Sequence, residues 1–468
     1  MEEFMTRKIS TKLYLSIVAT GLMAFCGVLI ETAMNVTFPT LMTQFNVDTA
    51  TIQWLTTGYL LVVSIIVPIS GVLKRRFTTM QLFLTASAFF IVGLLICTLA
   101  NRFDVLLIGR IIQGLGTGIA LPLMFNIILE QAPLDKIGLL MGIGTLVTAI
   151  APALGPTYGG LLIGLNWHAI FGILLAIMVI ALFLGIFSIT QVSKTVKVRL
   201  DFPSWIAIAI FFAGAILGLN NIEASLTTAS IYGLIGIIGL IGFIVRSKHI
   251  DDPIIRLNVF KNKSFDLHVV SFVVFQIMNV GVAFVLPNYL QIVAHTSSLT
   301  AGLLLLPGAA LGAILAPVSG TIYDRLGPTK PITIALVFQT MGLIVLLVEA
   351  LSASPVSQLI GYILMMLGTG FGMSTIITNG LAQIPKAENV DGNAVFNTLQ
   401  QFAGAFGTAV ISMVVALAQV KTDYVHTTAV GAQHAFIVLM VLEVVNIICI
   451  FTGLHFDKSR NQDQDASN

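Results

Sequence analysis

Fourteen long apolar runs follow one another along the chain, and they restrict its fold more than any other feature. A helix needs about 20 apolar residues to cross the hydrocarbon core of a bilayer, where only helices and closed barrels satisfy their backbone polar groups. The chain is 57% hydrophobic and 9% charged, far from a soluble composition, and the runs leave no room for a large soluble catalytic domain. We therefore expect an all-α polytopic membrane protein. The predicted spans lie near residues 13–37, 50–72, 80–100, 104–128, 137–161, 168–190, 203–221, 229–246, 266–290, 300–322, 331–350, 356–380, 393–418 and 433–454.

The charges of the loops predict the orientation. An even number of spans places both termini on one side, and Lys and Arg collect in cytoplasmic loops. With a cytoplasmic N-terminus, all 23 basic residues except Arg102, Lys421 and the membrane-embedded Arg110 fall in cytoplasmic segments. The first run extends past Glu31 and is followed by further runs, so we expect a transmembrane helix there and not a cleaved signal peptide. Both termini are expected in the cytoplasm, with the chain in the plasma membrane.

Composition excludes several classes of function. The 23 Lys and Arg are balanced by 21 Asp and Glu, so no basic face for nucleic acid is expected. The cysteines, Cys26, Cys97 and Cys449, lie in apolar runs, where neither a disulfide framework nor a metal site has support. The spans show no His, Asp and Glu cluster with the spacing of metal ligands or of a catalytic set. We expect no metal, no cofactor and no enzymatic activity, and an intramembrane enzyme or a transport-inactive sensor is the least favoured alternative.

A short basic turn follows the second run and again the tenth. The first turn reads Gly-Val-Leu-Lys-Arg-Arg-Phe from Gly71, and the second reads Gly-Thr-Ile-Tyr-Asp-Arg-Leu-Gly from Gly320. Similar turns at matching places indicate internal repeats. We predict an N-terminal six-helix bundle over residues 1–200, an inserted transmembrane hairpin over 201–248, and a C-terminal six-helix bundle with a cytoplasmic tail over 249–468.

The fourth run carries a membrane arginine, Arg110, followed by Gln113 and several glycines. An embedded arginine costs roughly 2.5–3.5 kcal/mol on insertion scales, so it usually faces a cavity or an acidic partner. The glycines allow a neighbouring helix to approach closely. The alternative is that Arg110 extends to the outer surface near Asp104.

The fifth run repeats small residues and prolines at steps of three and four. Such a stripe makes one helical face smooth enough for close packing, and its prolines remove backbone donors and permit a kink. Generic packing of membrane helices is the alternative interpretation. The residues concerned are Pro152, Gly155, Pro156, Gly159 and Gly160.

These two runs carry a family resemblance. Arg110-Ile-Ile-Gln-Gly resembles the Arg-x-x-Gln-Gly signature of the major facilitator superfamily, and the segment from Ala151 to Gly160 resembles its antiporter signature in the fifth span. Residues 31–39, 53–59 and 166–171 are similar to the fourteen-span drug:proton antiporters, the EmrB/QacA-like branch.

The resemblance implies the major facilitator fold, two pseudo-symmetric six-helix bundles plus the inserted hairpin, in a bacterial exporter that works as a monomer. It also implies alternating access and the export of amphipathic, cationic or neutral compounds in exchange for protons, with the proton gradient as the energy source. Its partners would be small amphipathic substrates, protons and the lipid bilayer. A dedicated exporter of one metabolite or lipid-like compound is the alternative, and uptake by proton symport is disfavoured only by the fifth-span resemblance.

Several positions depart from the family pattern. In the turn after the second span, the usual aspartate is Arg75 and the second glycine is Thr78, so a gate carboxylate of this kind is expected at the second turn. In the first span, Glu31 stands where aspartate is common. The gate residues expected at the two turns are Gly71, Arg76, Gly320, Asp324, Arg325 and Gly327.

We expect Glu31 to carry the proton and Arg110 to be its electrostatic partner. Measured from the outer ends of their spans, their depths agree within about 3 Å at a rise of 1.5 Å per residue. Glu443, with Asn446 one turn away, is the rival carrier, for which a structural task is favoured. Hydrogen bonding between helices is the alternative role of each amide in the expected substrate wall. That wall comprises Asn35, Tyr59, Asn126, Phe272, Gln276, Asn279, Asn397 and Gln401.

Overall fold

The structure is a computed structural model. It describes residues 10–133, 137–192, 194–196, 200–222, 225–250, 253–385 and 388–467, with only the backbone described at 137–139, 142, 145–146, 148–149, 390 and 457–467. Six basic residues that support the predicted orientation lie outside the described residues: Arg7, Lys8, Lys136, Lys197, Arg199 and Lys386.

All long elements of the described chain are α-helices, which confirms the predicted all-α fold class. The first part of the chain forms α1 (Thr11–Phe45), α2 (Thr49–Ile52), α3 (Trp54–Ile66), α4 (Ser70–Arg76), α5 (Thr79–Leu99), α6 (Phe103–Gln131), α7 (Ile137–Ile163) and α8 (His168–Ser188). The middle forms α9 (Phe202–Asn220) and α10 (Leu226–His249). The last part forms α11 (Lys263–Ile292), α12 (Ser298–Leu326), α13 (Thr329–Val348), α14 (Pro355–Ala382), α15 (Asn389–Ala418) and α16 (Tyr424–Ser467).

Local sequence explains where several helices begin and break. The Ser10 hydroxyl caps α1 by accepting from the Leu13 N–H at 3.1 Å, and Thr78 and Gln81 form a reciprocal capping box at α5, which satisfies the free N–H groups of a first turn. The predicted second span is divided into α2, α3 and α4. One division is the 3-10 turn Val67–Ile69 around Pro68, since proline cannot donate to the helical ladder.

Thirteen helices of the described chain are long and apolar enough to cross a membrane. The predicted span that is not among these thirteen, residues 137–161, corresponds to α7, a helix of 27 residues, in which Ile150–Ile163 forms a shorter apolar helix. The prediction of a multi-pass membrane protein is confirmed.

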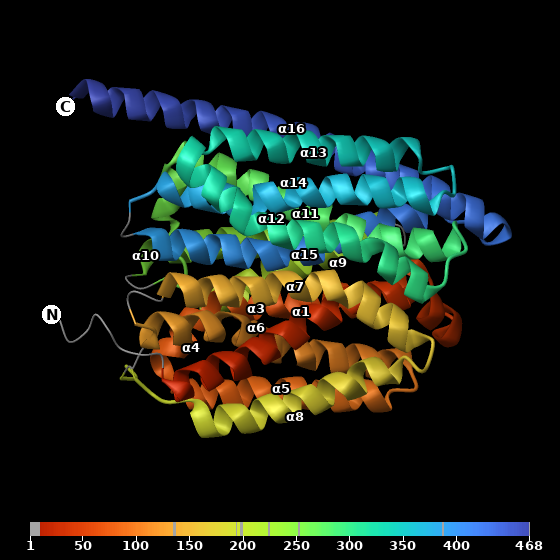
Figure 1. Ribbon diagram of the computed structural model, residues 1–468, viewed down its shortest axis with the longest axis horizontal. Helices are drawn as coiled ribbons and strands as arrows, with labels where there is room; N and C mark the ends of the chain where they lie inside the picture. The colour runs from red at the N-terminus through yellow and green to blue at the C-terminus, as the bar shows by residue number, and fades with distance from the viewer. Residues whose placement is uncertain are drawn as a thin grey trace.

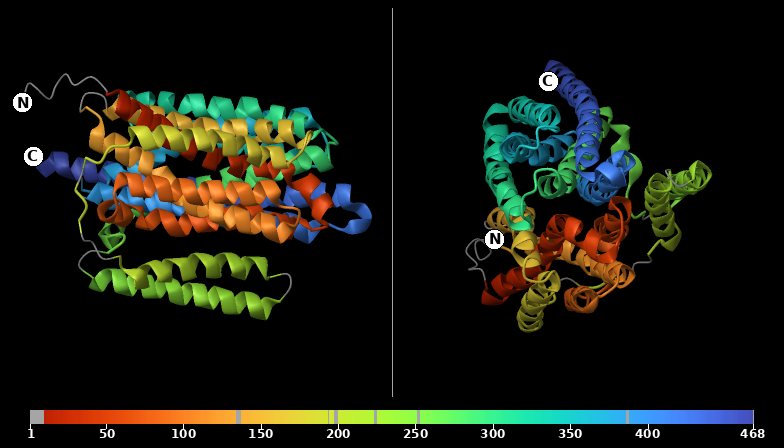
Figure 2. Two further views of the ribbon diagram at one scale, coloured as in Figure 1. Left: turned by 90° about the horizontal axis from the view of Figure 1, so that it is seen from below. Right: turned by 90° about the vertical axis from the view of Figure 1, so that its right-hand side faces the viewer.

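The helices lie side by side along the long dimension of the molecule (Figure 1). The start of α1 and the C-terminal end of α16 lie at the same end of the bundle (Figures 1 and 2), as an even number of crossings requires. We name this end the proximal end and the opposite one the distal end.

Helix packing groups α1 with α6, α7 and α8 in the N-terminal part, and α11 with α14, α15 and α16 in the C-terminal part. We refer to residues 10–192 and 253–467 as the N-terminal and C-terminal halves. The halves meet where α7 packs on α12, α1 on α11, and α3 on α15. The site described below is therefore built from helices that are far apart in the sequence.

The helices α9 and α10 pack on each other and form a hairpin beside the main bundle (Figure 2). Arg246 and Asp201 form an ion pair of 2.7 Å at its proximal base. The Trp205 indole N–H donates to the Ile65 carbonyl of α3 at 2.8 Å, and α9 also packs on α15. The hairpin thus contacts both halves through α9.

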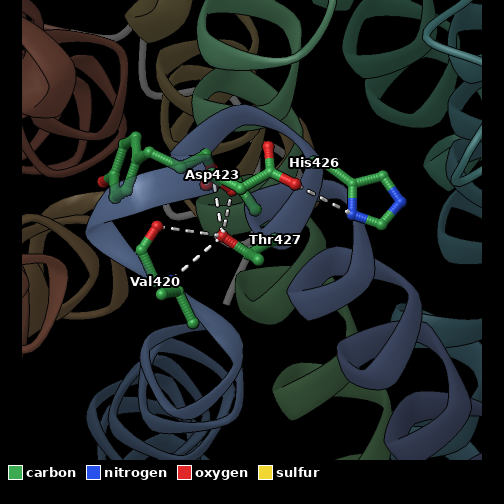
Figure 3. Close-up of polar contacts among 6 residues, drawn as sticks. Val420, Asp423, His426 and Thr427 are labelled. Carbon is green, nitrogen blue, oxygen red and sulfur yellow. Dashed lines mark hydrogen bonds and ion pairs between the residues drawn. The ribbon is translucent and has the colours of Figure 1, made fainter.

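The distal turn between α15 and α16 is held by local bonds (Figure 3). The Thr427 hydroxyl donates to the Asp423 carbonyl at 2.6 Å and accepts from the Val420 N–H at 3.0 Å. His426 Nδ1 lies 3.7 Å from Asp423 Oδ2, with both side chains about two thirds exposed. An exposed pair of this kind contributes little to stability, so the hydroxyl contacts define the turn.

Candidate functional site

A buried arginine is the centre of the N-terminal half. Arg110 of α6 is 0% exposed and does not extend to the distal surface. Its Nε donates to the Leu55 carbonyl of α3 at 3.0 Å, and its Nη1 donates to Gln113 Oε1 at 2.8 Å. The Tyr59 ring covers one face of the guanidinium, 4.1 Å from Cζ to ring centroid. Among the described residues, Nη2 has no hydrogen-bond partner, so one donor group of a fixed guanidinium is free.

Glu31 of α1 is half-buried and lies within electrostatic range of Arg110. The pair is not among the ion pairs within 4.0 Å in the described part of the chain, and the same residues offer the Glu31 carboxylate no hydrogen bond. A membrane carboxyl without such a partner costs free energy. A chain that keeps one at this cost is expected to use it for its function. The structure brings the two groups near each other, and their role in proton coupling stays a prediction.

The glycine stripe of α7 meets α1 beside Glu31. A Cβ added at Gly155 would overlap the Thr32 hydroxyl, and one at Gly159 would lie 2.5 Å from the Ala33 carbonyl oxygen. Only glycine permits this approach of two helix backbones. The packing surface predicted for α7 therefore lies against the turn of α1 that follows the candidate proton carrier.

The same helix meets α12 of the other half. A Cβ added at Gly160 would overlap the Ser298 carbonyl, and the Thr157 hydroxyl donates to the Gly302 carbonyl at 3.1 Å. These contacts lie at the distal end, where α7 ends and α12 begins. Pro152 and Pro156 lie inside α7, and a hinge at these prolines stays a prediction.

The first basic turn lies at the proximal end and is tied to its own half. Lys74 forms an ion pair of 2.8 Å with Glu130 of α6, while Arg75 and Arg76 are exposed. The family's usual aspartate is replaced here by Arg75, and a carboxylate of α6 supplies an acidic partner to the turn instead. The sequence analysis did not identify Glu130, because its contact with Lys74 depends on the packing of α4 on α6.

The second basic turn is more open. Asp324 and Arg325 are exposed at the end of α12, and Gly327 ends the helix with a φ of +76°, which glycine adopts without strain. A Cβ added at Gly71 or at Gly320 would meet nothing within 4 Å. The two turns are thus free of close contact at these glycines, whereas the α7 glycines at the distal end are tightly packed.

Three residues of the expected substrate wall are buried. Tyr59 and Phe272 are 0% exposed, and Phe272 packs edge-on against Phe396 with ring centroids 5.1 Å apart. The Asn35 amide donates to the Ala283 carbonyl of α11 at 3.2 Å and accepts from the Thr56 hydroxyl at 3.1 Å. In this conformation Asn35 links the two halves.

The other residues of that wall keep some accessible surface. Asn126, Gln276, Asn279 and Gln401 are half-buried and Asn397 is exposed. They belong to α6, α11 and α15, and α15 packs on α11. These amides are the members of the set with accessible surface in this conformation, and their role in substrate binding stays a prediction.

A buried histidine was missed from the sequence. His268 of α11 is 0% exposed. Its Nδ1 lies 2.7 Å from the Ser264 carbonyl and therefore donates, which leaves Nε2 to accept from the Asn379 amide at 2.6 Å. The Tyr323 hydroxyl donates to Asn379 Oδ1 at 3.2 Å. These hydrogen bonds connect α11, α14 and α12 next to Asp324. A single histidine in an apolar run does not indicate such a network.

The carboxyl of Glu443 on α16 is 0% exposed. It accepts from the Thr340 hydroxyl of α13 at 3.0 Å and from the Asn446 amide at 2.9 Å. The Ser271 hydroxyl of α11 donates in turn to Asn446 at 2.5 Å. Both carboxyl oxygens are therefore bonded, by neutral donors.

Comparison with known proteins identifies related chains. A family profile described as Major Facilitator Superfamily matches residues 20–408. The chain is 38% identical over 449 residues to the lincomycin resistance protein LmrB of Bacillus subtilis, covering 92% of this chain and 93% of that protein. It is 27% identical to a multidrug resistance protein B homolog of Mycobacterium tuberculosis, covering 82% and 72%. A crystal structure of a POT family transporter in complex with a thioalcohol-conjugated peptide has a TM-score of 0.70 at 14% identity, covering 94% and 95%.

Proposed function

This chain belongs to the Major Facilitator Superfamily, and we propose that it is a proton-coupled antiporter that exports amphipathic drugs and toxic compounds by alternating access. Membership of this family makes it a transporter and not an enzyme. In the proposal, the proximal end faces the cytoplasm of a bacterial cell, the proton gradient supplies the energy, and a single chain is the working unit.

The drug class is supported by the relatives named for lincomycin and multidrug resistance, which align over most of the chain. The accessible amides of α6, α11 and α15 stand among apolar helices. Apolar surface with a few polar groups suits loosely specified ligands. A cationic or neutral amphipathic compound is the class that fits both observations.

Proton coupling rests on one observation. In the described part of the chain, the half-buried carboxyl of Glu31 has no hydrogen-bond partner, and it lies near the buried Arg110 guanidinium, whose Nη2 has none either. Weakly polar surroundings favour a protonated carboxyl, while a nearby cation favours the ionised form. A carboxyl under two opposed influences changes its protonation when one of them changes, which is what coupling requires.

The packing supports a conformation open to the cytoplasm, because the halves touch closely at the distal end and the glycines of the basic turns are free. In this conformation Glu31 releases its proton to the cytoplasm and the substrate binds from there. After the halves rock, Glu31 takes a proton from the outer side and the substrate leaves. A cationic substrate and the proton compete for one carboxylate, so each turnover exchanges one for the other.

The test uses proteoliposomes of known orientation with an imposed pH gradient, and lincomycin and a quaternary ammonium dye as probes. We expect uphill movement of the probe away from the cytoplasmic face, driven by protons moving the opposite way. Counterflow in the same vesicles separates export from symport. Equal probe distribution at every gradient, with correctly inserted protein, contradicts the proposal.

Breadth of substrate requires a second measurement, because the alternative is a dedicated exporter of one metabolite or lipid-like compound. A growth-inhibition panel in a pump-deficient host compares the chain with its Glu31→Gln variant. Resistance to several unrelated amphipathic compounds supports the multidrug exporter. Resistance to none of them, with export of one cellular compound, favours the alternative.

A further inference from the structure

Tyr59 of α3 lies where three helices of the N-terminal half meet. Its ring centroid is 4.1 Å from Cζ of Arg110 on α6. Its hydroxyl is 2.8 Å from the Gly27 carbonyl of α1 and 2.8 Å from the Thr117 hydroxyl of α6. The side chain is 0% exposed. In this conformation the ring offers no surface to a substrate, so its contacts indicate a different task from the one expected from the sequence.

We propose that Tyr59 is a positioning residue for proton coupling, which holds the Arg110 guanidinium at a fixed separation from the Glu31 carboxyl. It acts through Arg110 and α1, and it neither carries the proton nor binds the substrate. The inference rests on the proposed function, because that separation matters to transport only if Glu31 is the proton carrier.

The first contact fixes α1. Gly27 precedes Glu31 by four residues, so the two lie one turn apart on the same helical face. The bond from Tyr59 to the Gly27 carbonyl therefore attaches α3 to the turn of α1 that leads to the carboxyl. A Cβ added at Gly27 would lie 2.7 Å from Thr117, so α1 also contacts α6 directly at this level.

The second contact fixes the guanidinium. A cation over an aromatic face is held more strongly where water is excluded, and both groups here are fully buried. The same helix α3 also supplies the Leu55 carbonyl that accepts from Arg110 Nε. Because α3 holds Arg110 at two points, the free Nη2 has a defined place relative to α1.

In the described part of the chain, two buried thiols also lie near this centre, Cys97 of α5 and Cys26 of α1. A thiol in apolar surroundings is neutral, so neither places a charge beside Arg110 or Tyr59. Among the described acidic residues, Glu31 lies within electrostatic range of both Tyr59 and Arg110. A displaced Arg110 therefore changes the proton affinity of Glu31 first.

If the separation of Arg110 and Glu31 is fixed within the N-terminal half, the movement that changes proton binding occurs elsewhere. Asn35 lies one turn beyond Glu31 and donates to the Ala283 carbonyl of the C-terminal half. When the halves rock, this contact across the interface breaks while the contacts of Tyr59 are kept. The proton affinity of Glu31 then alternates with the approach of α11 and with access of water, at an unchanged distance from Arg110.

The test is a proton titration of the purified full-length protein in lipid nanodiscs, followed by infrared difference spectroscopy of carboxyl groups. The Glu31 band is the one absent in Glu31→Gln. Tyr59→Met keeps bulk without an aromatic face, and we expect the Glu31 midpoint to move to higher pH by about one unit. Tyr59→Phe keeps the ring and loses the bond to Gly27, and the expected shift is about half a unit.

Matched controls are Tyr362→Met and Tyr362→Phe, because Tyr362 of α14 is also buried, at 6% exposure, and lies in the other half. These should leave the Glu31 midpoint unchanged. An unchanged midpoint in Tyr59→Met, or in Tyr59→Phe where Tyr59→Met does not fold, overturns the inference. An equal shift in the Tyr362 variants does the same, since it would reflect general loosening.

Failure of the proposed function gives a different result. Wild-type proteoliposomes then show no acid-driven export of lincomycin or of the quaternary ammonium dye, while the infrared titration still reports on Tyr59. If export is intact, the pH profile of transport should shift in the same direction and order as the Glu31 midpoint. A transport profile that stays in place while the Glu31 band moves separates the carboxyl from the coupling step.

Discussion

The two halves each bury an ionisable centre, and they treat its charge in opposite ways. In the N-terminal half, the Arg110 cation is fully buried, its Nη2 has no hydrogen-bond partner among the residues that the structure describes, and Glu31 is half-buried. In the C-terminal half, Glu443 is fully buried and both its oxygens accept hydrogen bonds from Thr340 and Asn446. The first centre leaves polar groups unsatisfied, while the second satisfies them.

This difference separates function from structure. A buried polar group that has its partners contributes to stability, while one without them costs about 1–3 kcal/mol. In the N-terminal centre, the unsatisfied group of Arg110 lies near the half-buried carboxyl of Glu31. A site that must bind and release a proton is expected to tolerate this free-energy cost. The C-terminal centre has the features of a structural hydrogen-bond network that links α16, α13 and α11.

The largest effect is expected from the helix surface that supports Glu31. In Gly155→Leu, the new side chain collides with Thr32 of α1, so transport should be lost in both the uphill and the downhill direction. Membrane insertion should remain, because the span becomes more apolar. Proteoliposome flux and a protease-accessibility assay measure the two properties.

Gly164→Leu is the matched control for that change, because a Cβ there would meet its nearest atom only at 4.0 Å. It should transport like the wild type. Wild-type flux in Gly155→Leu would show that the packing of α7 on α1 is not needed for the cycle.

Glu31→Gln should abolish acid-driven export and keep downhill, pH-insensitive movement, because the amide cannot take up and release a proton. Affinity for neutral compounds should be largely kept. Probe efflux from proteoliposomes with and without a pH gradient measures this, with Glu349→Gln near the distal end of α13 as the control. Uphill export by Glu31→Gln with an unchanged pH profile would remove Glu31 from the coupling site.

The sequence predicts features that depend on residues close together in the chain, but not contacts between residues that are far apart in it. The spans follow from apolar length. Residue counting places Glu31 and Arg110 at similar depths because the first span is expected to end near residue 37, whereas α1 continues to Phe45. Their nearness in the structure therefore depends on how α1 and α6 pack. The proline break at Pro68 and the extension of α16 to Ser467 alter local limits of the predicted spans. Hydropathy reports burial in a membrane and not helix continuity.

Contacts between helices were beyond such reasoning. Tyr59 carries the same polar signal whether it lines a substrate path or lies under Arg110, and only the packing of α1, α3 and α6 decides. The bond of His268 to Asn379 joins residues 111 positions apart. No periodicity within one run identifies a partner on another.

Arg110→Ala should have a smaller effect than Glu31→Gln, because the carrier is kept and only its neighbour is lost. Loss of a nearby cation lets a carboxyl keep its proton to higher pH, so the pH profile of export should move upward by about one to two units. Initial efflux rates across a pH series measure the shift. Arg102→Ala is the control, since Arg102 is exposed and pairs with Asp104 at the distal surface. A downward shift in Arg110→Ala would contradict the assigned sign of the interaction.

The smallest effect on transport is expected from Glu443→Gln, which removes a carboxyl buried as deeply as Arg110. Glutamine keeps the shape: its oxygen accepts from the Asn446 amide, and its amide nitrogen donates to the Thr340 hydroxyl, which reverses the direction of that bond. Both hydrogen bonds are kept, so thermal unfolding should report a destabilisation below about 1 kcal/mol. The pH profile of export should stay in place, because both donors are neutral and no cation of the site depends on Glu443. If Glu443→Gln proteoliposomes lose acid-driven export while Glu31→Gln ones keep it, the satisfied centre is the coupling site. The unsatisfied one would then be structural, which would reverse the inference from hydrogen-bond satisfaction to function in this fold.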